Sequence, residues 1–433
     1  MQSHSILPLQ DQLKPIVDLY SKGKIQGALD SIEALIKNYP NEPLIFNIKG
    51  ACFAGLGQLD NAVKCYEKAI SIAPNYADAH NNLGNTLKRL GEFGEAVTSL
   101  DKALDINPNH LDANYNLGST LRELGKFKAS IQNYKKVITI KPTHYEAHFF
   151  IGVCYIKIKK IDLAIIHFEQ TIILNPDYAP AYLNLGNIFG QLNQSNKAIE
   201  YYKKALIIKP DYSQAKHMIN ALKGNKSTGS SKAYIKNLFD SYAETFNESL
   251  VEKLEYKLPF IIRELILDLD FDRKKLNKVI DLGCGTGLSG QGLRDISENL
   301  TGIDISKNMV DKARELGVYD NLIVGDIVEI LRLSKEKYDL FVALDVFIYV
   351  GELKAIFKTV RNCCNKNAFF IFSTEIQTDD GYSLLKSARF SHSDEYILKT
   401  AFNEFKLIES QDINLRKDNK GWINGRLYIF QAY

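Results

Sequence analysis

The chain has 433 residues, of which 45% are hydrophobic and 24% are charged, as in an ordinary globular protein. This length predicts two or three domains, and the composition excludes a mainly disordered chain, a collagen and a small disulfide-stapled fold. The net charge is only +3, with 25 basic against 20 acidic residues in 1–223 and 28 against 31 in 232–433. Because neither part has the basic excess that binds phosphate backbones, we expect no nucleic-acid partner.

Targeting and membrane signals are weak along the whole sequence. The first twelve residues lack the basic stretch and apolar core of a signal peptide. No apolar run approaches the roughly 18 residues of a membrane span. Six cysteines are present, and none forms a C-x-x-C pair. These features predict a cytoplasmic protein with reduced thiols, no membrane contact and no metal site.

A repeat of 34 residues organises the first half of the chain. Prolines stand at positions 40, 74, 108, 142, 176 and 210. The intervals divide the sequence into six units, residues 9–42, 43–76, 77–110, 111–144, 145–178 and 179–212. Glycine recurs at the eighth place of a unit, a small residue at the twentieth and an aromatic residue at the twenty-fourth. Such a fixed period is the signature of a repeat architecture.

The spacing within each unit fits a pair of antiparallel helices. Small residues let the two helices approach closely, and larger ones fill the space between them. Gly57, Gly91 and Gly125 suit the left-handed turn between the helices. This pattern resembles the tetratricopeptide repeat over residues 9–212, which implies an all-α superhelix. Residues 213–223 are predicted to form a solvating cap helix, so the first domain spans residues 9–223.

A solenoid of this kind exposes a concave groove along its first helices. Asparagines recur there, and their amides can grip the backbone of an extended peptide. The alternative is that asparagine at these places serves the repeat itself. Glu146 and Phe150 stand where a carboxylate clamp would need basic residues, which disfavours a chaperone tail as ligand. We predict a protein or peptide partner bound by Asn82, Asn85, Asn116, Asn184 and Asn187.

Beyond a polar linker at residues 224–231, the pattern changes to alternating strands and helices. Two helical runs come first, the second at about residues 250–268. Strands are predicted at 277–282, 300–304, 321–325, 338–344 and 368–374, with helices at about 287–297, 307–315 and 352–364. Strands near 405–414 and 425–432 form a closing hairpin. Residues 232–433 are thus predicted to be an α/β Rossmann-like domain with a mostly parallel sheet.

The first predicted strand runs into the glycine-rich segment V-I-D-L-G-C-G-T-G-L. Its glycines, Gly283, Gly285 and Gly287, permit a tight turn and close approach of a ligand before a helix N-terminus. Asp281 precedes them and can bind a cationic amino group. Asp304 ends the next strand and suits ribose hydroxyls. The G-x-G-x-G spacing disfavours a nicotinamide-dependent oxidoreductase, which is one alternative reading.

These motifs resemble those of class I S-adenosylmethionine-dependent methyltransferases over roughly residues 234–433. The resemblance implies that G-I-D-I places Asp304 at the ribose, and that G-D-I places Asp326 and the amide of Ile327 at the adenine. It also implies that Asp345 lies near the methionine end, and that S-Y-A-E-T-F forms a lid over the cofactor. The implied cofactor-binding residues are Asp281, Gly283, Cys284, Gly285, Gly287, Asp304, Ile305, Asp326, Ile327, Asp345, Tyr242 and Phe246.

More narrowly, the combination resembles bacterial tetratricopeptide-containing methyltransferases and an animal group related to the Williams–Beuren region methyltransferase. The segments that carry this likeness are residues 239–259, 345–351 and 387–393.

The insertion after the fifth strand should overhang the cofactor, because ligands sit outside the carboxyl ends of parallel strands. It carries Glu375 and the three residues that we predict to be catalytic, His392, Arg389 and Tyr382. His392 has an ordinary pKa suited to a general base, and Arg389 can hold an anionic group of the substrate. The N/D-P-P-Y motif of adenine and amide methyltransferases is absent after the fourth strand.

The sequence therefore predicts an enzyme that transfers a methyl group from S-adenosylmethionine to an oxygen or nitrogen acceptor, with the repeat array recruiting a protein. The rival hypothesis is an adaptor whose methyltransferase fold is catalytically silent. The glycine turn and the three acids placed around it favour the enzyme.

Overall fold

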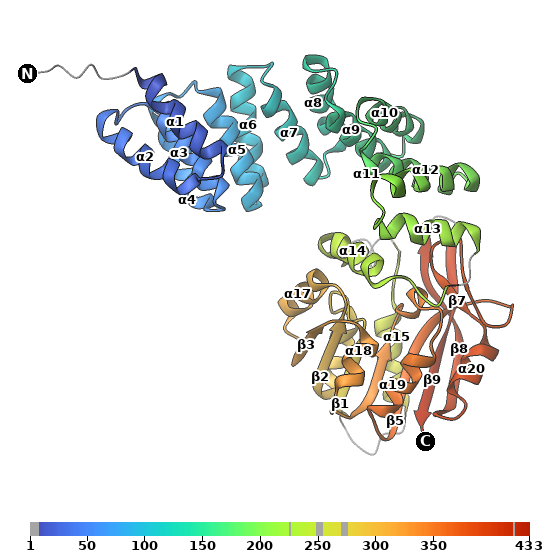
Figure 1. Cartoon of the computed structure of the whole chain (residues 1–433). Coiled ribbons are helices and arrows are strands. Elements are labelled where there is room, and N and C mark those ends of the chain that lie inside the picture. The colour runs from blue at the N-terminus through green and yellow to red at the C-terminus, as the bar shows by residue number, and fades with distance from the viewer. Residues whose placement is uncertain (1–7, 225–226, 248–253, 270–275, 419–420) are drawn as a thin grey trace, which may run out of the picture. The chain divides into compact units, whose positions relative to one another are not determined.

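The computed structural model describes residues 8–224, 227–247, 254–269, 276–418 and 421–433. The chain forms two compact units, Met1–Leu192 and Asn193–Tyr433 (Figure 1). Parts of the predicted linker, of the predicted helix at about 250–268 and of the closing turn lie outside the described residues. No helix among the described residues combines the length and the apolar character needed to cross a lipid bilayer.

The first unit consists of helices, paired as the 34-residue period predicts. The helices are α1 (Leu9–Ser21), α2 (Ile25–Asn38), α3 (Pro43–Gly55), α4 (Leu59–Ile72), α5 (Ala77–Leu90), α6 (Phe93–Ile106), α7 (Leu111–Glu123), α8 (Phe127–Ile140), α9 (Tyr145–Lys157), α10 (Ile161–Leu174) and α11 (Ala179–Gln191).

The repeat positions act as their spacing predicts. A Cβ added at Gly84 would lie 2.6 Å from Leu100 Cγ, so the glycine at the eighth place makes room for the large residue at the twenty-fourth. The turn glycines have positive φ, 76° at Gly57 and 85° at Gly91. Repeat five keeps this left-handed turn with Lys159, whose φ is 59°. The left-handed turn is therefore kept where lysine replaces glycine, although the side chain makes that conformation less favourable.

The second unit begins with helices and continues into the sheet. The helices before the sheet are α12 (Ser195–Ile208), α13 (Ser213–Lys223), α14 (Lys232–Tyr242) and α15 (Leu258–Asp268). The strands are β1 (Leu276–Leu282), β2 (Ser297–Asp304), β3 (Asn321–Val324), β4 (Tyr338–Ala343), β5 (Cys364–Ile376), β6 (Tyr382–Leu384), β7 (Phe390–His392), β8 (Phe405–Asp418) and β9 (Gly421–Ala432). Between them lie α16 (Leu288–Leu293), α17 (Lys307–Leu316), α18 (Ile327–Leu333), α19 (Lys354–Asn362) and α20 (Asp394–Ala401).

The sheet has the order β3-β2-β1-β4-β5-β7-β6, and β9 pairs with both β5 and β8. The pairs from β3 to β5 are parallel, whereas β5–β9 and β8–β9 are antiparallel. The predicted mostly parallel sheet and its closing hairpin are thus confirmed. The strand order reverses between β1 and β4, and a crevice forms at the carboxyl ends of the strands at such a switch point.

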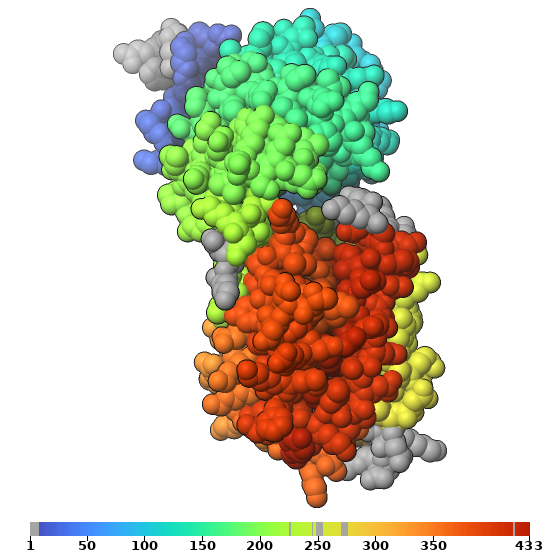
Figure 2. Space-filling model, turned by 90° about the vertical axis from the view of Figure 1, so that its right-hand side faces the viewer, coloured from blue at the N-terminus to red at the C-terminus, as the bar shows by residue number. Residues whose placement is uncertain are grey.

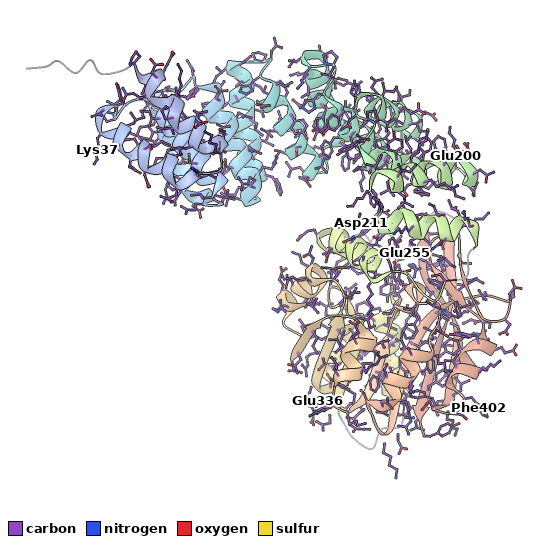
Figure 3. All side chains as sticks on the ribbon, in the orientation of Figure 1. Lys37, Glu200, Asp211, Glu255, Glu336 and Phe402 are labelled. Carbon is purple, nitrogen blue, oxygen red and sulfur yellow. The ribbon has the colours of Figure 1, made fainter. Side chains whose placement is uncertain are left out.

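Each face of the sheet is covered by its own apolar cluster. On one face, Phe341 and Phe370 pack with residues of α18, α19 and α20. On the other face, Val279 and Leu340 pack with residues of α15 and α16. In the space-filling view of Figure 2, orange and red surface from the C-terminal part of the chain covers much of the visible face of this unit. Charged side chains such as Lys37 and Glu336 project outward (Figure 3), and Phe402 is 74% exposed.

The predicted insertion after β5 holds three elements that the sequence did not indicate. Strands β6 and β7 have three residues each, and α20 has eight. Elements this short span too few residues to show an apolar period. Helix α18 was missed for the same reason, since it has seven residues.

We expect Gly84→Ala to destabilise the helical repeats by about 1–3 kcal/mol, because the added methyl group overlaps Leu100 Cγ and lies 3.0 Å from the carbonyl oxygen of Ala96. Gly94→Ala is the matched control, because a Cβ at that helical position meets no atom within 4 Å. This control should leave stability unchanged or raise it. Urea unfolding followed by circular dichroism measures both. An equal loss in the two variants would contradict the packing role of Gly84.

Candidate active site

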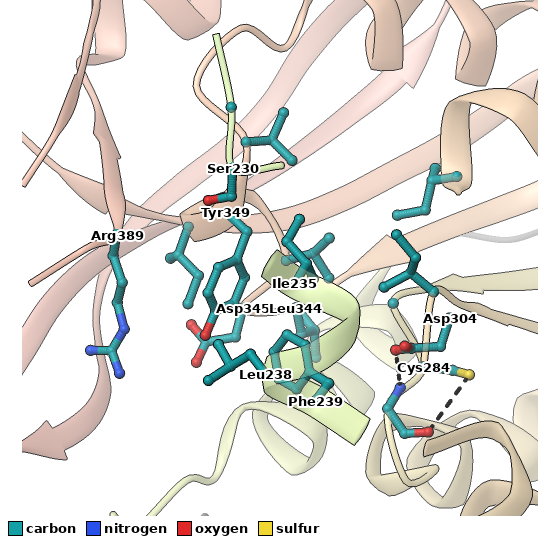
Figure 4. Close-up of a pocket in the computed structure, with 18 of the residues that line it drawn as sticks. Ser230, Ile235, Leu238, Phe239, Cys284, Asp304, Leu344, Asp345, Tyr349 and Arg389 are labelled. Atoms are coloured by element: carbon teal, nitrogen blue, oxygen red, sulfur yellow. Dashed lines mark hydrogen bonds between the residues drawn. The ribbon is translucent and has the colours of Figure 1, made fainter. Parts of the chain in front are cut away.

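A cavity of about 540 Å³ lies at the carboxyl ends of the central strands. The turn after β1, the end of β2, the loop after β4 and the helix α14 line it, together with residues of the loop between β6 and β7. Figure 4 shows Asp304 and Cys284 at one end and Arg389 at the other, with Leu238 and Phe239 of α14 between them. The predicted residues that line it are Gly283, Cys284, Gly285, Asp304, Ile305, Asp326, Ile327, Asp345, Tyr242, Phe246 and Arg389.

The glycine turn is tied to the end of β2 through backbone groups. The amides of Gly283 and Cys284 donate to the carbonyl oxygen of Ile303 at 2.7 and 3.0 Å. Gly283 has a φ of 78°, and a Cβ there would lie 2.5 Å from Val346 Cγ2. Only glycine fits this position, because both the conformation and the space exclude a side chain.

Asp304 holds the same turn with its carboxylate. Its Oδ2 accepts the amide of Gly285 at 2.9 Å (Figure 4), and its Oδ1 accepts the amide of Ser306 at 2.8 Å. Burial raises the pKa of Asp304 to about 6, and the two amide donors limit that rise. A buried carboxylate at the cavity wall keeps further lone pairs for ligand hydroxyl groups.

Asp281 and Gly287 are the two predicted cofactor residues that do not line the cavity. Asp281 is 1% exposed, and its Oδ2 accepts the hydroxyl of Tyr319 at 2.7 Å. Its Oδ1 is buried and has no hydrogen-bond partner among the described residues. Burial raises the pKa of this carboxyl to about 7. The structure places Asp281 beneath the turn and outside the cavity lining, and its contact with a cofactor amino group stays a prediction.

Helix α14 covers the cavity and is anchored near both of its ends. Lys232 Nζ lies 3.4 Å from Asp326 and 2.7 Å from Glu329. At the other end, the hydroxyl of Ser306 donates to Asp240 at 2.6 Å. The predicted lid residues Tyr242 and Phe246 follow on this segment and line the cavity, which agrees with a covering role. Asp326 also caps α18 by accepting the amide of Glu329 at 3.1 Å.

The opposite end of the cavity holds a buried arginine between two carboxylates. Arg416 of β8 is 2% exposed and donates to Asp345 Oδ2 and, at 2.5 Å, to Glu375 Oε1. Burial by itself would lower the pKa of Arg416, but the two carboxylates reverse that effect and raise it. Removing one partner of such a pair leaves an uncompensated buried charge. Asp345 adopts a φ of 58°, a conformation that costs energy for a residue with a side chain and clusters at functional sites.

Arg389 reaches the cavity from the loop between β6 and β7. Its guanidinium lies 3.9 Å from Glu375 Oε1, and its side chain is 29% exposed. Burial raises the pKa of the neighbouring Tyr349 hydroxyl, while the positive charges of Arg389 and Arg416 lower it. This end of the cavity therefore combines cations, carboxylates and a phenol.

His392 and Tyr382 lie outside the cavity lining. His392 is fully buried, its Nε2 lies 3.0 Å from the carbonyl oxygen of Gly351, and burial lowers its pKa to about 4. Tyr382 packs edge-on against Phe390 and Tyr396. The predicted role of His392 as a general base does not fit a buried imidazole that is hydrogen-bonded to the backbone. Tyr382 belongs to the apolar support of the loop.

The predicted groove asparagines are engaged within the repeats. Asn82 Nδ2 donates to Asn47 Oδ1 at 3.0 Å, and Asn116 Nδ2 donates to Asn81 Oδ1 at 2.9 Å. These bonds join one repeat to the next and satisfy amides that are partly buried. Asn184 donates to the carbonyl oxygen of Pro180 at 2.9 Å. Asn85 and Asn187 are half-buried. Peptide binding by these five residues stays a prediction, and Asn82 and Asn116 also serve the repeat itself.

Sequence reasoning missed several residues of the cavity wall, among them Lys232, Tyr234, Tyr256, Tyr349 and Arg416. Arg416 lies just past the end of the strand predicted at 405–414. Its role depends on Asp345 and Glu375, which are 71 and 41 positions away along the chain. A single sequence carries no signal for such pairing.

Comparison with known proteins agrees with both halves of this architecture. The methyltransferase-domain family matches residues 280–372. Tetratricopeptide-repeat families match residues 50–91, 75–143, 145–178 and 179–212. The chain therefore joins tetratricopeptide repeats to a domain of the methyltransferase family, a class that in general uses S-adenosylmethionine. The narrower Williams–Beuren resemblance stays a prediction.

Individual relatives match only parts of the chain. A ubiquinone biosynthesis O-methyltransferase of Actinobacillus pleuropneumoniae is 27% identical over 146 residues, 31% of this chain and 60% of that protein. An 18S rRNA (guanine-N(7))-methyltransferase of Bos taurus is 36% identical over 66 residues, 15% of this chain and 24% of that protein. The chain thus spans at most about three fifths of these two relatives. A crystal structure of MamA is 27% identical, covers 37% of this chain and 94% of that one, and has a TM-score of 0.36.

The buried Asp281 gives a test based on pH. Its folded pKa of about 7 lies above the ordinary 3.8, so the folded protein holds a proton that the unfolded chain has released at pH 5. Raising the pH from 5 to 8 therefore lowers the stability of the wild type, by about 2 kcal/mol for this group. We expect Asp281→Asn to remove that loss, so urea unfolding should show its stability rising relative to wild type with pH.

The control is Asp311→Asn, which removes an exposed carboxylate whose pKa is lowered by Lys307 and Arg314. A lowered pKa contributes stability that is fully present above 3.8, so this difference should be flat between pH 5 and 8. A flat difference for Asp281→Asn as well would contradict the raised pKa of its carboxyl in the folded protein.

Proposed function

We propose that the chain is an S-adenosylmethionine-dependent methyltransferase that transfers a methyl group to an oxygen or nitrogen of an acceptor. The observation that carries this proposal is the glycine turn locked to Asp304 at one end of a covered cavity, with a polar cluster at the other. The rival, a silent methyltransferase fold that serves as an adaptor, would need neither a covered cavity nor a charged cluster at its end.

The residues around the cavity are compatible with bound S-adenosylmethionine. Gly285 leaves open space where a side chain would stand, and Asp304 offers acceptor atoms for ribose hydroxyls. Asp326, Ile327 and Asp345 line the same cavity, and we propose Asp326 and Ile327 for the adenine and Asp345 for the methionine end. S-adenosylmethionine supplies a methyl group already activated on a sulfonium. The protein's contribution to such a displacement is chiefly orientation of the acceptor and exclusion of water.

Arg389 and Asp345 are the residues that we propose for the acceptor. Arg389 presents a guanidinium that can bind a carboxylate in two parallel hydrogen bonds. Asp345 lines the same end and can take the proton that an acceptor oxygen or nitrogen loses as its bond to the methyl carbon forms. Its Oδ2 accepts a hydrogen bond from Arg416, and its buried Oδ1 has no hydrogen-bond partner among the described residues, so that oxygen is left to receive the proton. We therefore favour an acceptor that carries a carboxylate beside the methylated group.

The repeats give the chain a second task. Tetratricopeptide repeats bind proteins or peptides in general, and we propose that these recruit either the protein that is methylated or a scaffold for the enzyme. The carboxylate-bearing acceptor belongs either to that recruited protein or to a separate molecule.

Calorimetric titration of the full chain with S-adenosylhomocysteine tests the cofactor. We expect micromolar affinity, no competition by NAD, and a loss of at least tenfold in Asp304→Asn. Asp311→Asn is the matched control, because its side chain is 38% exposed on α17 and lies outside the cavity lining. Since the pKa of Asp304 is about 6, wild-type affinity should fall between pH 7.5 and 5 if the ionised form accepts the ribose hydroxyls. If S-adenosylhomocysteine does not bind at any pH, the proposal that the chain is a methyltransferase is wrong.

Release of S-adenosylhomocysteine from S-adenosylmethionine tests the acceptor class. A panel of small hydroxy and amino compounds is offered in pairs, with and without a carboxylate. We expect turnover of carboxylated members and at least a tenfold loss with Arg389→Gln, whose cofactor affinity should be retained. Preference for the uncharged members would contradict the role of Arg389, and cofactor binding without any turnover would favour the adaptor.

A further inference from the structure

The cap helix α13 contacts two walls of the cavity through one side chain. His217 is 6% exposed, and its Nε2 lies 2.9 Å from the carbonyl oxygen of Ala388. Its ring stacks on Tyr234 with centroids 4.2 Å apart and planes inclined by 23°. Tyr234 belongs to the covering helix α14, and Ala388 belongs to the loop that carries Arg389. His217 therefore joins the cover to the acceptor end.

The backbone at Ala388 is under strain that the surrounding contacts must hold. Ala388 has a φ of 65°, a left-handed conformation that is unfavourable for a residue with a side chain. Two bonds close the turn, from the amide of Ala388 to Leu385 at 2.9 Å and from the amide of Leu385 to Arg389 at 2.8 Å. The carbonyl of Ala388 faces away from this turn toward His217. That carbonyl belongs to the peptide that joins Ala388 to Arg389. The hydrogen bond from His217 therefore fixes the position of the Arg389 backbone.

Apolar packing seals this contact on the side of the cap helix. Ala221 and Met218 of α13 pack with Leu384, Ala388 and Phe390. Burial lowers the pKa of His217, which favours the neutral ring. A neutral imidazole beside a carbonyl oxygen must carry its proton on the nitrogen that faces the oxygen. The structure thus requires the tautomer with hydrogen on Nε2.

We infer that His217 is a positioning residue of the acceptor site. From outside the cavity, it fixes the Ala388–Arg389 peptide and the covering helix α14 relative to each other. This inference rests on the proposed function of Arg389. Its consequence concerns the chain's organisation, because a domain boundary at residues 224–231 would separate His217 from both of its partners. The last helix before the linker then supports the wall of the cavity from outside.

Two substitutions in the full chain separate the two contacts. His217→Gln keeps an N–H donor at a similar reach and loses the ring. His217→Phe keeps a ring that can stack on Tyr234 and loses the donor. Lys216→Ala is the control, since Lys216 is the exposed neighbour on the same helix. Hydrogen–deuterium exchange is followed in peptides that cover residues 382–393 and 232–242, without ligand, and affinity for S-adenosylhomocysteine is measured separately.

We expect His217→Phe to speed exchange in residues 382–393 at least tenfold and to change cofactor affinity less than about twofold. His217→Gln should restore slow exchange there, because the donor to Ala388 is kept, while exchange in residues 232–242 rises. Lys216→Ala should match the wild type. Unchanged exchange in His217→Phe, or an equal rise across the whole second unit, would overturn the positioning role.

A measurement on the wild type covers the case in which a variant does not fold. In protein labelled with nitrogen-15 at histidine, the His217 ring should show hydrogen on Nε2 and exchange that proton slowly. A ring protonated only on Nδ1 could not donate to Ala388 and would overturn the inference. Failure of cofactor binding alone would refute the proposed function and would leave the exchange result to decide the role of His217.

Discussion

The cavity depends on the hydrogen bonds that the carboxylate of Asp304 accepts. This carboxylate accepts amides from the glycine turn after β1 and from the start of α17, so it fixes two loops at one point. Those two loops form the floor of the cavity. The hydroxyl of Ser306 donates to Asp240 and so joins the covering helix α14 to the same loops. A single charged group at the end of a strand thereby sets the turn, the helix and the cover. Its burial raises its pKa, so the arrangement is sensitive to its protonation.

The opposite end of the cavity is organised by different physics. Arg416 lies between Asp345 and Glu375, and Arg389 lies near the latter. Two cations and two carboxylates balance in charge, which limits the electrostatic cost of placing them below the surface. Two residues of this end, Asp345 and Ala388, hold left-handed backbone conformations despite having side chains. Contacts from β8 and from the cap helix maintain these conformations. We propose that the residues held in this way orient the acceptor.

Most of the fold was predictable because it is encoded in periods and local motifs. The 34-residue interval predicts the helix pairs, and the glycine turn with Asp304 predicts the end of the cavity that we propose for the cofactor. At the opposite end, the sequence predicts Asp345, Glu375 and Arg389. His392 was chosen for its ordinary pKa, but burial of its ring and the contact with the Gly351 carbonyl are tertiary facts. Arg416, Tyr349 and His217 act through partners distant in sequence, and no local pattern indicates such contacts.

A crystal structure of the full chain with S-adenosylhomocysteine would locate both ends of the cavity at once. We predict density for the ribose at the Asp304 carboxylate and for the adenine beside Asp326 and Ile327, with the sulfur directed toward Asp345 and Arg389. A ligand bound in the reverse direction would contradict the assignment of the acceptor end. Crystals grown at saturating ligand that show density elsewhere or none in this cavity would contradict the methyltransferase site itself.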